Sequence, residues 1–408
     1  MAKKYRGVTA AETHGAVLDL IRSRGEVSRT ELADLTGLTA TSITRIVRQL
    51  LADDLVVETG LGESTGGKRR TLLQLNPGSR HAVGISLNER RITYVLTDLS
   101  GQVVARDTAD GIGLSTPQQV VERMAAELKQ LLAAAGLIGS VLMGVGIAVS
   151  GRQDARHQVL RSNPYATDWE EFALEQSLGA ATGLPVILDN DSTCAAIGEF
   201  WAGRVDTHAD FAVVYMTTGY GLGLISGGRV YRGASSNAGE IGHVTVDTGG
   251  PVCVCGRTGC LHAVARADRL VELALADPRL GGLNLEGTAE ATLADYLTIA
   301  AAAERGDPAA AELIRQAATY LASALVSATN LLDLNRIVLA GPGFDRAGGF
   351  FADAANAALA ADSYLRKVHG TTVELSGMGT DIAALGAASM VLHAQLTPHL
   401  SHSPMESP

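Results

Sequence analysis

The order of strand-like and helix-like segments repeats within this chain, and the repeat limits the folds that the chain can adopt. Three consecutive apolar runs have the length and alternation of strands: 82–87, 92–97 and 103–105. They precede a helical pattern at about 117–135. A similar set of strands starts again later in the chain: 211–217 and 221–225, with Gly227 and Gly228 turning the chain. We therefore expect two α/β units of the same design, each built around its own sheet.

Further segments complete these two units. Strongly apolar runs predict three more strands: 143–149, 186–189 and 337–340. Helical periodicity predicts four more helices: 192–203, 266–275, 291–304 and 308–332. A strand meander followed by a helix, present twice, is typical of the two lobes of an actin-like fold.

The first 76 residues have a different pattern. Three amphipathic helical stretches come before two strand-like runs, which a Gly-rich basic stretch joins. Ser28 and Glu31 are spaced as a capping box for the second helix, and Gly37 breaks that helix. This order predicts a winged helix-turn-helix, whose third helix enters the major groove of DNA.

The third of these helices has an apolar stripe and, away from it, short polar and basic side chains that can reach bases or phosphates. The candidate DNA contacts on this helix are Thr39, Thr41, Ser42, Thr44, Arg45 and Arg48. Basic residues at the tip of the wing suit the DNA backbone or a minor groove: Lys68, Arg69 and Arg70. The alternative is a helical interaction module whose polar face is only solvated.

Composition and charge agree with this organisation. Hydrophobic residues make up 46% of the chain but aromatic residues only 4%, so the cores must consist mainly of Ala, Val, Leu and Ile. Residues 1–76 have a net charge of +2 and the remainder −12, so a slightly basic head precedes an acidic body. We expect double-stranded operator DNA as a partner of the head. No apolar run reaches the ~18 residues of a membrane span, and no signal peptide is visible, so we expect a cytoplasmic protein without a membrane partner.

Three of the four cysteines lie within eight residues. Such spacing favours a metal site over a disulfide framework. Three thiolates and one imidazole make a closed tetrahedral set, the usual structural zinc site, and Gly256 and Gly259 let the chain wrap around the ion. We expect one structural zinc per chain, with these ligands: His243, Cys253, Cys255 and Cys260. Three buried thiols without a metal are the alternative; we expect Cys194 to be a core residue.

The stretch 238–243 followed by 253–261 resembles the signature of the ROK family, which groups bacterial repressors with sugar kinases. The resemblance covers essentially the whole chain, including the winged helix of the family's regulators. It implies the fold class: an N-terminal winged helix-turn-helix followed by an α/β two-lobed actin-like (ribonuclease H-like) sugar-kinase fold. We divide the chain accordingly: 1–76 DNA-binding domain; 80–195 first lobe, completed by helix 383–396; 196–382 second lobe with the zinc loop; 397–408 disordered tail.

The resemblance also implies a sugar site between the lobes. An acid beside an amide at the end of a strand, as in Asn190-Asp191, is placed to bond adjacent hydroxyls of a sugar; helix capping alone is the alternative. In the family's kinases an Asp at the position of Asp191 is the general base. The implied sugar contacts are Gly151, Arg152, Asn163, Asn190, Asp191, Glu240, His243 and His262.

The sequence departs from the family's pattern at two places. The kinases have an Asp-x-Gly-Gly-Thr loop that holds the phosphates of ATP, whereas Ser86–Arg90 here lacks the acid and both glycines. The glycine-rich turn 217–223 is largely kept, which a tight turn also explains. His262 stands where the family usually has a sugar-binding Glu, and an imidazole can donate as well as accept. His262 therefore either selects the sugar or supports the metal site.

These observations predict a transcriptional regulator, expected to be a repressor, whose DNA affinity changes when a sugar, phosphosugar or oligosaccharide binds between the lobes. We expect it to act as a homodimer or homotetramer and to have no enzymatic activity. An active sugar kinase with an added DNA-binding domain is the second reading, and a scaffold without a ligand is the third.

Overall fold

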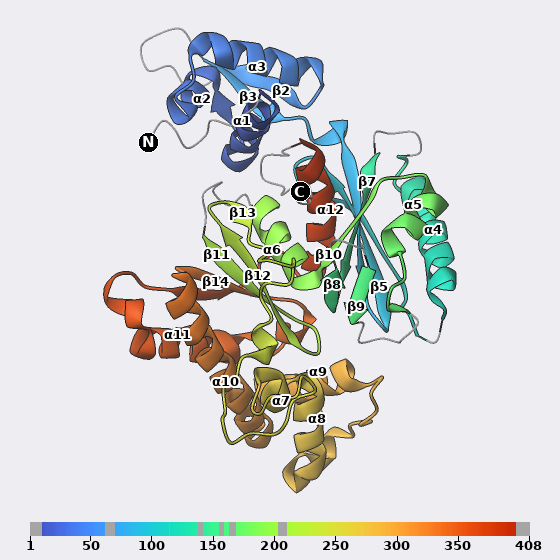
Figure 1. Ribbon diagram of the computed structural model, residues 1–408, viewed down its shortest axis with the longest axis vertical. Helices are drawn as coiled ribbons and strands as arrows, with labels where there is room; N and C mark the ends of the chain where they lie inside the picture. The colour runs from blue at the N-terminus through green and yellow to red at the C-terminus, as the bar shows by residue number, and fades with distance from the viewer. Residues whose placement is uncertain are drawn as a thin grey trace.

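The computed structural model shows a small N-terminal head above a larger body (Figure 1). It describes these residues: 10–61, 70–113, 115–137, 142–154, 159–162, 169–202 and 210–396. The predicted tail 397–408 and three predicted site residues, Lys68, Arg69 and Asn163, lie outside them.

The head is a winged helix-turn-helix, as predicted. Its helices are α1 (Ala10–Arg24), α2 (Arg29–Thr36) and α3 (Ala40–Ala52). Its strands form an antiparallel sheet in the order β1-β3-β2: β1 (Val27–Ser28), β2 (Val56–Leu61) and β3 (Thr71–Leu75). The capping box is confirmed, because Ser28 accepts from the backbone N–H of Glu31 and the Glu31 carboxylate accepts from that of Ser28. Gly37, at a φ of 66°, ends α2.

The first lobe has a five-stranded sheet in the order β10-β7-β4-β5-β6. Its strands are β4 (His81–Leu87), β5 (Arg91–Asp98), β6 (Val103–Asp110), β7 (Leu142–Val149) and β10 (Val186–Asn190). Two helices, α4 (Pro117–Ala134) and α5 (Leu174–Thr182), cover one face of this sheet, and α12 (Ile382–Leu396) covers the other (Figure 1). A small hairpin, β8 (Arg152–Asp154) and β9 (Val159–Ser162), lies beside it.

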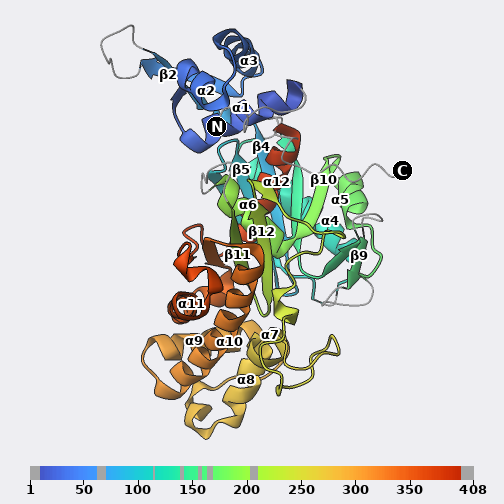
Figure 2. The same ribbon diagram turned by 60° about the vertical axis from the view of Figure 1, so that its left-hand side comes forward.

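The second lobe repeats the design with a sheet in the order β13-β12-β11-β14-β15. Its strands are β11 (Phe211–Met216), β12 (Tyr220–Ser226), β13 (Arg229–Val230), β14 (Arg336–Ala340) and β15 (Thr372–Leu375). Five helices pack below and beside this sheet (Figure 2): α7 (Leu261–Ala265), α8 (Ala267–Ala276), α9 (Thr292–Glu304), α10 (Pro308–Leu332) and α11 (Gly348–Asp362). The predicted repeat is therefore present.

Helices α6 (Asp191–Trp201) and α12 pack against each other between the two sheets. Their backbones nearly touch: a Cβ on Gly386 would lie 1.6 Å from the carbonyl oxygen of Cys194. In the same way, Gly84 on β4 leaves room for the carbonyl of Ala384 on α12. The predicted division between residues 195 and 196 falls inside α6, which continues through it without a break. This helix consequently belongs to both lobes.

Candidate functional site

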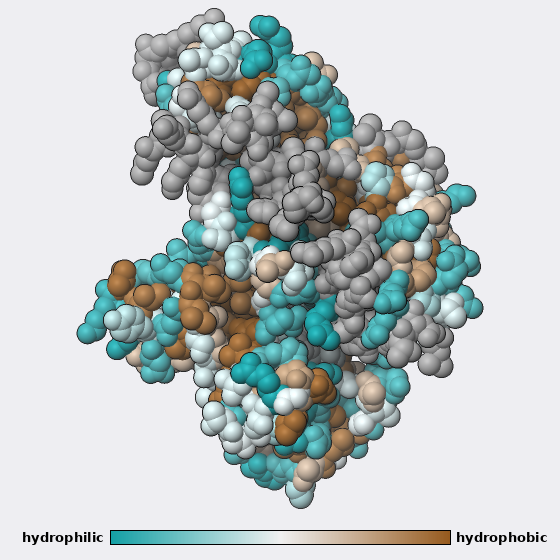
Figure 3. Space-filling model, in the orientation of Figure 1, coloured by the Kyte–Doolittle hydropathy of each residue, from teal (hydrophilic) through white to brown (hydrophobic). Residues whose placement is uncertain are grey.

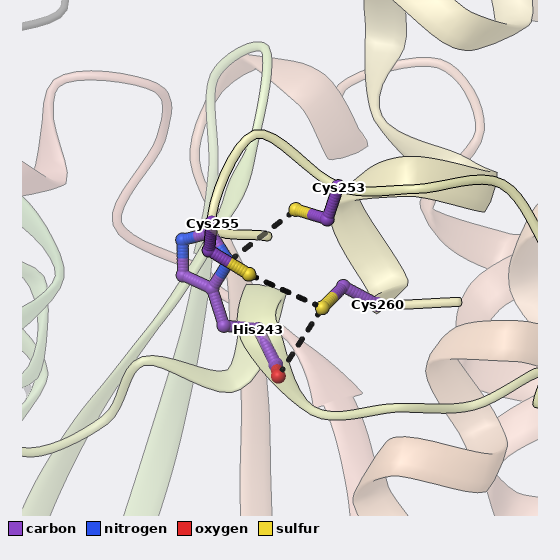
Figure 4. A group of neighbouring side chains, drawn as sticks. All are labelled: His243, Cys253, Cys255 and Cys260. Carbon is purple, nitrogen blue, oxygen red and sulfur yellow. Dashed lines mark hydrogen bonds between the residues drawn. The ribbon is translucent and has the colours of Figure 1, made fainter. Parts of the chain in front are cut away.

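The four predicted metal ligands converge on one point (Figure 4). Their ligand atoms all lie within 4.8 Å of one another. The sulfur of Cys253 is 3.6 Å from Nδ1 of His243, and the sulfurs of Cys255 and Cys260 are 3.6 Å apart. Zinc ligands at usual bond lengths lie about 3.8 Å apart for two sulfurs and about 3.6 Å for sulfur and nitrogen. The donor set and its spacing fit a tetrahedral zinc ion.

The loop that carries the thiols is shaped by its glycines. Gly256 has a φ of 85° and Gly259 a φ of 67°, a region that other residues seldom adopt. A Cβ on Gly259 would also lie 1.4 Å from the carbonyl oxygen of Asp247, so only glycine fits there. The backbone of Cys253 donates to the carbonyl of Arg257 at 2.7 Å, which closes the turn between the first two thiols and the third.

The thiols differ in their readiness to ionise. Burial, followed by the neighbouring thiols of Cys255 and Cys253, raises the pKa of Cys260 to about 12. The backbone N–H of Arg257 lowers the pKa of the more exposed Cys255. A bound cation would keep all three cysteines deprotonated, because it replaces the protons that neighbouring thiols otherwise retain. His243, Cys253, Cys255 and Cys260 would hold the ion and fix the loop.

The predicted acid and amide lie where β10 meets α6. Asn190 caps α6 by accepting from the backbone N–H groups of Ser192 and Thr193. Asp191 is the first residue of the helix, and its carboxylate accepts from the Ser150 hydroxyl and from the backbone N–H of Ser192. Asn190 is thus the N-cap of α6, and Ser150 at the end of β7 holds the Asp191 carboxylate, whose predicted sugar contact stays a prediction.

Burial raises the pKa of Asp191, the bonds from Ser150 and Ser192 oppose this rise, and the Glu240 carboxylate adds to it. That electrostatic interaction places Glu240 near Asp191, although the two residues are far apart in the chain. Glu240 itself is exposed and directly precedes the short helix η3 (Ile241–His243). The structure thus brings Asp191, Glu240 and the metal ligand His243 into one region.

His262 lies against this region but outside the group of metal ligands. Its Nε2 accepts from the backbone N–H of Tyr220 at 2.9 Å, its ring stacks on the Tyr220 ring, and it meets the His243 ring edge-on at 5.0 Å. Burial is the largest of the causes that lower the pKa of His262, to about 4. The ring is therefore neutral at neutral pH, and its Nε2 also lies 3.2 Å from the carbonyl oxygen of Tyr220.

Two glycines explain the position of this imidazole. A Cβ on Gly242 would lie 2.1 Å from Nε2 of His262, and a Cβ on Gly219 would lie 3.0 Å from it. The ring is thus inserted between two stretches of backbone, one within η3 and one at the turn before β12. His262 packs against the side of the loop that carries His243 and lies outside the group of four residues that could hold a metal ion.

Two of the predicted sugar contacts, Gly151 and Arg152, follow the end of β7. Gly151 is half-buried and has a φ of 109°, so a glycine is suited to this turn. Arg152 is exposed at the start of β8. Neither Gly151 nor Arg152 forms a hydrogen bond or ion pair with Asp191 in the described part of the chain, so their part in a sugar site stays a prediction, as does that of Asn163.

The turn that replaces the kinase phosphate loop is tied down by its own carbonyl groups. The carbonyls of Asn88, Glu89 and Arg90 accept from the backbone N–H groups of residues 111–113 at 2.8–3.1 Å. The Asn88 amide donates to the Ser86 hydroxyl, and a Cβ on Gly111 would lie 2.1 Å from the carbonyl oxygen of Glu89. The turn is thus fastened to residues 111–113 through its backbone carbonyls, and it lacks the glycines with which the kinase loop brings backbone N–H groups to the phosphates.

The glycine-rich turn at 217–223 has a packing role. A Cβ on Gly223 would lie 2.1 Å from the carbonyl oxygen of Ser192, and a Cβ on Gly221 would lie 2.8 Å from the Ser192 side chain. These two glycines let β12 approach the start of α6. They join the second lobe closely to the helix that carries Asp191.

The predicted DNA-contacting residues of α3 lie on its solvent side. The helix buries an apolar stripe: Ile43, Ile46, Val47 and Leu50. Arg45 and Arg48 are exposed on the other side. Two of the hydroxyls already have local partners, since Thr39 caps the helix and Thr44 donates to the carbonyl of Ala40 at 2.8 Å. Thr41, Ser42 and the wing residue Arg70 complete the described part of this surface, with Ser42 half-buried and the other two exposed.

Three residues at the site were not found from the sequence. Ser150 orients Asp191, Tyr220 binds His262, and Arg232 forms an ion pair with the buried Asp189 one residue before Asn190. No local motif marks them, because each contact joins segments more than 40 residues apart. For the Arg232 contact, the sequence offers one signal: Asp189 lies near the end of an apolar strand, where a carboxylate needs a partner.

Comparisons with known proteins agree with this geometry. A sequence profile described as the ROK family matches residues 82–394, and one described as winged helix-turn-helix DNA-binding matches residues 11–57. The chain is 29% identical to the DNA-binding transcriptional dual regulator NagC of Escherichia coli over 336 residues, 80% of this chain and 79% of that one. It is 25% identical to the xylose repressor of Caldicellulosiruptor bescii, over 93% of this chain and 95% of that one.

Solved structures give the same result. A ROK family transcriptional regulator, described as a homologue of the E. coli MLC protein, matches with a TM-score of 0.76 and 25% identity, over 95% of this chain and 98% of that one. A ROK family glucokinase from Streptomyces griseus, in complex with glucose and AMPPNP, matches with a TM-score of 0.61 and 25% identity, over 76% of this chain and 98% of the kinase. Among the described residues, none of the helices has the length and apolar character to span a membrane.

Proposed function

The chain belongs to the ROK family and begins with a winged helix-turn-helix, and from this premise we propose that it is a sugar-responsive repressor of genes for carbohydrate metabolism. The observation that carries the proposal is the pairing, in one chain, of an exposed polar face on α3 with the group formed by Asp191, Glu240 and His243. Two relatives support the proposal by their names: one is a xylose repressor, and the other, NagC, is a DNA-binding transcriptional dual regulator.

The proposed sugar site uses the start of α6 on one side and the zinc loop on the other. Asp191 and Glu240 would accept hydrogen bonds from hydroxyl groups, and Asn190 would add an amide. The Nδ1 atom of His243 faces the thiols, so Nε2 is the ring nitrogen that would contact the sugar. His262 would contribute through Nδ1, and the remaining proposed contacts lie on the covering loop: Gly151, Arg152 and Asn163.

Zinc would act structurally in this arrangement. It would hold His243 and the loop 253–260 in one conformation, so the imidazole would present the same nitrogen to every incoming sugar. All four positions of the tetrahedron would be filled by protein ligands. Residues of the protein, and not the ion, would therefore make the contacts with the sugar.

A dimer or tetramer would give the DNA-binding heads the spacing that paired operator half-sites require. Exposed apolar side chains at the end of α10, in the segment after α11 and at the end of β15 support an assembly through the second lobe: Leu331, Leu332, Tyr364, Val368 and Leu375. Figure 3 shows apolar side chains at the left-hand edge of the body, in the region where Figure 1 places α11.

Kinase activity is the second candidate function, because the fold is shared with the Streptomyces griseus glucokinase. We expect no sugar-dependent release of ADP from ATP above background, whereas enzymes commonly turn over at ~10 per second. The turn at Ser86–Arg90 lacks the acid and both glycines of the kinase phosphate loop, and its carbonyls fasten it to residues 111–113. A coupled ADP assay over the same sugars, with a ROK glucokinase as the positive control, checks this. Turnover at ~1 per second with any sugar would establish the kinase instead.

The proposed function is tested with a thermal-shift screen followed by DNA binding. Monosaccharides including xylose and N-acetylglucosamine, their 6-phosphates and small oligosaccharides are added at millimolar concentration, and the effector raises the melting temperature. DNA fragments selected by the protein then show whether this sugar lowers the affinity for operator DNA.

We expect Asp191→Asn to weaken sugar binding about ten- to a hundredfold, the effect of about 1.5–3 kcal/mol for a hydrogen bond to a charged group.

The matched control is Asp353→Asn, which changes an exposed carboxylate on α11. This variant should bind sugar and DNA as the unmodified protein does. Asp191→Asn should keep its affinity for operator DNA in the absence of sugar. A protein that no sugar stabilises, or whose DNA binding no sugar changes, would refute the proposed function.

A further inference from the structure

One arginine of the head is buried against the body. The Arg22 side chain, on α1, is only 2% exposed, and its Nε donates to Asp19 at 2.7 Å. Its Nη1 donates to the carbonyl oxygens of Phe200 at 3.0 Å and Trp201 at 2.7 Å. Its guanidinium also lies over both aromatic rings, 5.0 and 4.8 Å from their centroids.

These two carbonyls are the last of α6. The last carbonyls of a helix have no partner within the helix and carry its partial negative charge, so a cation is the natural cap. Here the cap comes from another domain, 178 residues earlier in the chain. Arg22 thus fixes the head to the C-terminal end of one particular helix.

The other end of the same helix is the proposed sugar site. Asn190 caps α6 and Asp191 is its first residue, so the 11-residue helix runs from the sugar contacts to the head. A helix of this length spans about 16 Å. The contacts of Asp191 and those of Arg22 are therefore made by opposite ends of one rigid element.

The packing around α6 restricts how it can respond. Gly221 and Gly223 bring β12 against its first turn, and Gly386 brings the backbone of α12 against its middle. With backbone in contact on two sides, the helix has little freedom to deform locally and will shift or tilt as a unit. A displacement of its first turn will therefore reach Phe200 and Trp201.

We propose that Arg22 couples the sugar site to the DNA-binding head by holding the C-terminal end of α6. The inference rests on the proposed function and adds the route by which sugar binding changes DNA binding. Hydrogen bonds from Arg22 to two successive carbonyls are directional, so a movement of α6 either carries α1 with it or breaks these bonds. Both outcomes change the position of α3 relative to the body.

Coupling is measured as the ratio of operator affinities without and with the sugar, which for allosteric proteins is typically 5- to 150-fold. In Arg22→Gln we expect this ratio to fall to within about twofold of one, while the DNA-free protein binds the sugar as before. Arg22→Lys keeps the ion pair with Asp19 but cannot reach both carbonyls in the same geometry, so its ratio should be intermediate. A purely structural role would lower affinities or melting temperature and leave the ratio unchanged.

Arg24→Gln is the matched control, since Arg24 is an exposed arginine in the same last turn of α1. It should keep the full ratio. An Arg22→Gln protein that also keeps the full ratio would overturn the inference, while the proposed function would stand. A protein that no sugar binds or regulates would instead remove the proposed function itself.

A second measurement keeps Arg22 intact and guards against misfolding of its variants. The chain has two tryptophans, Trp169 and Trp201. In Trp169→Phe, the remaining indole is the one beneath the Arg22 guanidinium. We expect the sugar to shift or quench Trp201 emission with the same concentration dependence as its effect on DNA binding. Regulated DNA binding with unchanged Trp201 emission would contradict the route through α6.

Discussion

Replacing Arg45 and Arg48 together by alanine is expected to weaken operator binding roughly 30- to 20,000-fold. Both side chains are exposed on the face of α3 opposite its buried stripe. An arginine that reads a guanine contributes about 1–3 kcal/mol of discrimination, so two independent contacts would add to about 2–6 kcal/mol. Because neither residue is part of the core, the melting temperature should stay close to that of the unmodified protein. Fluorescence anisotropy with a labelled operator gives the affinity.

Two further variants show what the loss means. Arg305→Ala, an exposed arginine on the body, should leave operator binding unchanged. Arg70→Ala at the wing should weaken operator and unrelated DNA alike and reduce the slope of log affinity against log salt by about 0.9 for one phosphate contact. If the Arg45 and Arg48 double variant binds the operator normally, α3 is not the recognition helix.

Cys255→Ser is expected to reduce the metal content from about one zinc per chain to near zero and to abolish the sugar response. Structural zinc contributes about 10–16 kcal/mol in small domains, and removing one of four ligands forfeits most of the site's selectivity. Cys255 is the exposed member of the group, so serine there disturbs packing least. Elemental analysis after dialysis against a chelator gives the metal content, and the thermal-shift screen gives the sugar response.

Cys194→Ala is the control for this change. Cys194 is a residue of α6 and is buried in the core that this helix shares with the second sheet, away from the four ligands, so its variant should retain zinc.

Zinc should also be lost as pH falls, because burial raises the pKa of Cys260 and protons compete with the ion for the thiols. Metal-free protein that binds sugar as well as the zinc-loaded form would refute the structural role of the ion.

The parts of the fold that were predicted from the sequence depend on neighbouring residues. The capping box of Ser28 and Glu31 fixes the start of α2 within four residues, and Gly37 fixes its end. The metal site was also predictable, because three of its ligands lie in one short loop and the fourth only ten residues before. In such cases residues that are close in the sequence are also close in the folded protein.

The elements that were missed depend on partners far away. Helix α11 begins with Gly348 and Gly349, which favour a loop, and it forms because α10 and β15 cover its apolar face. Strand β1 has only two residues and exists through its pairing with β3. Helix α5 and strands β13 and β15 are short, so their periodicity carries little information.

The interpretation of His262 needed the structure for the same reason. Its residue type allowed either a contact to the sugar or support of the metal site. The position of the imidazole depends on Gly219, Tyr220 and Gly242, whose backbones enclose the ring. The resulting desolvation keeps the imidazole neutral, which its sequence position could not show.

The position of α12 has a consequence for protein synthesis. This helix is translated after every other described element, yet Ala388, Val391 and Leu392 share a core with residues of the head, and Gly84 and Gly146 of the first sheet receive its backbone. A polypeptide released before residue 382 exposes the apolar surface that this helix covers. We therefore expect truncated products to be degraded faster than the finished protein, because their apolar core stays uncovered.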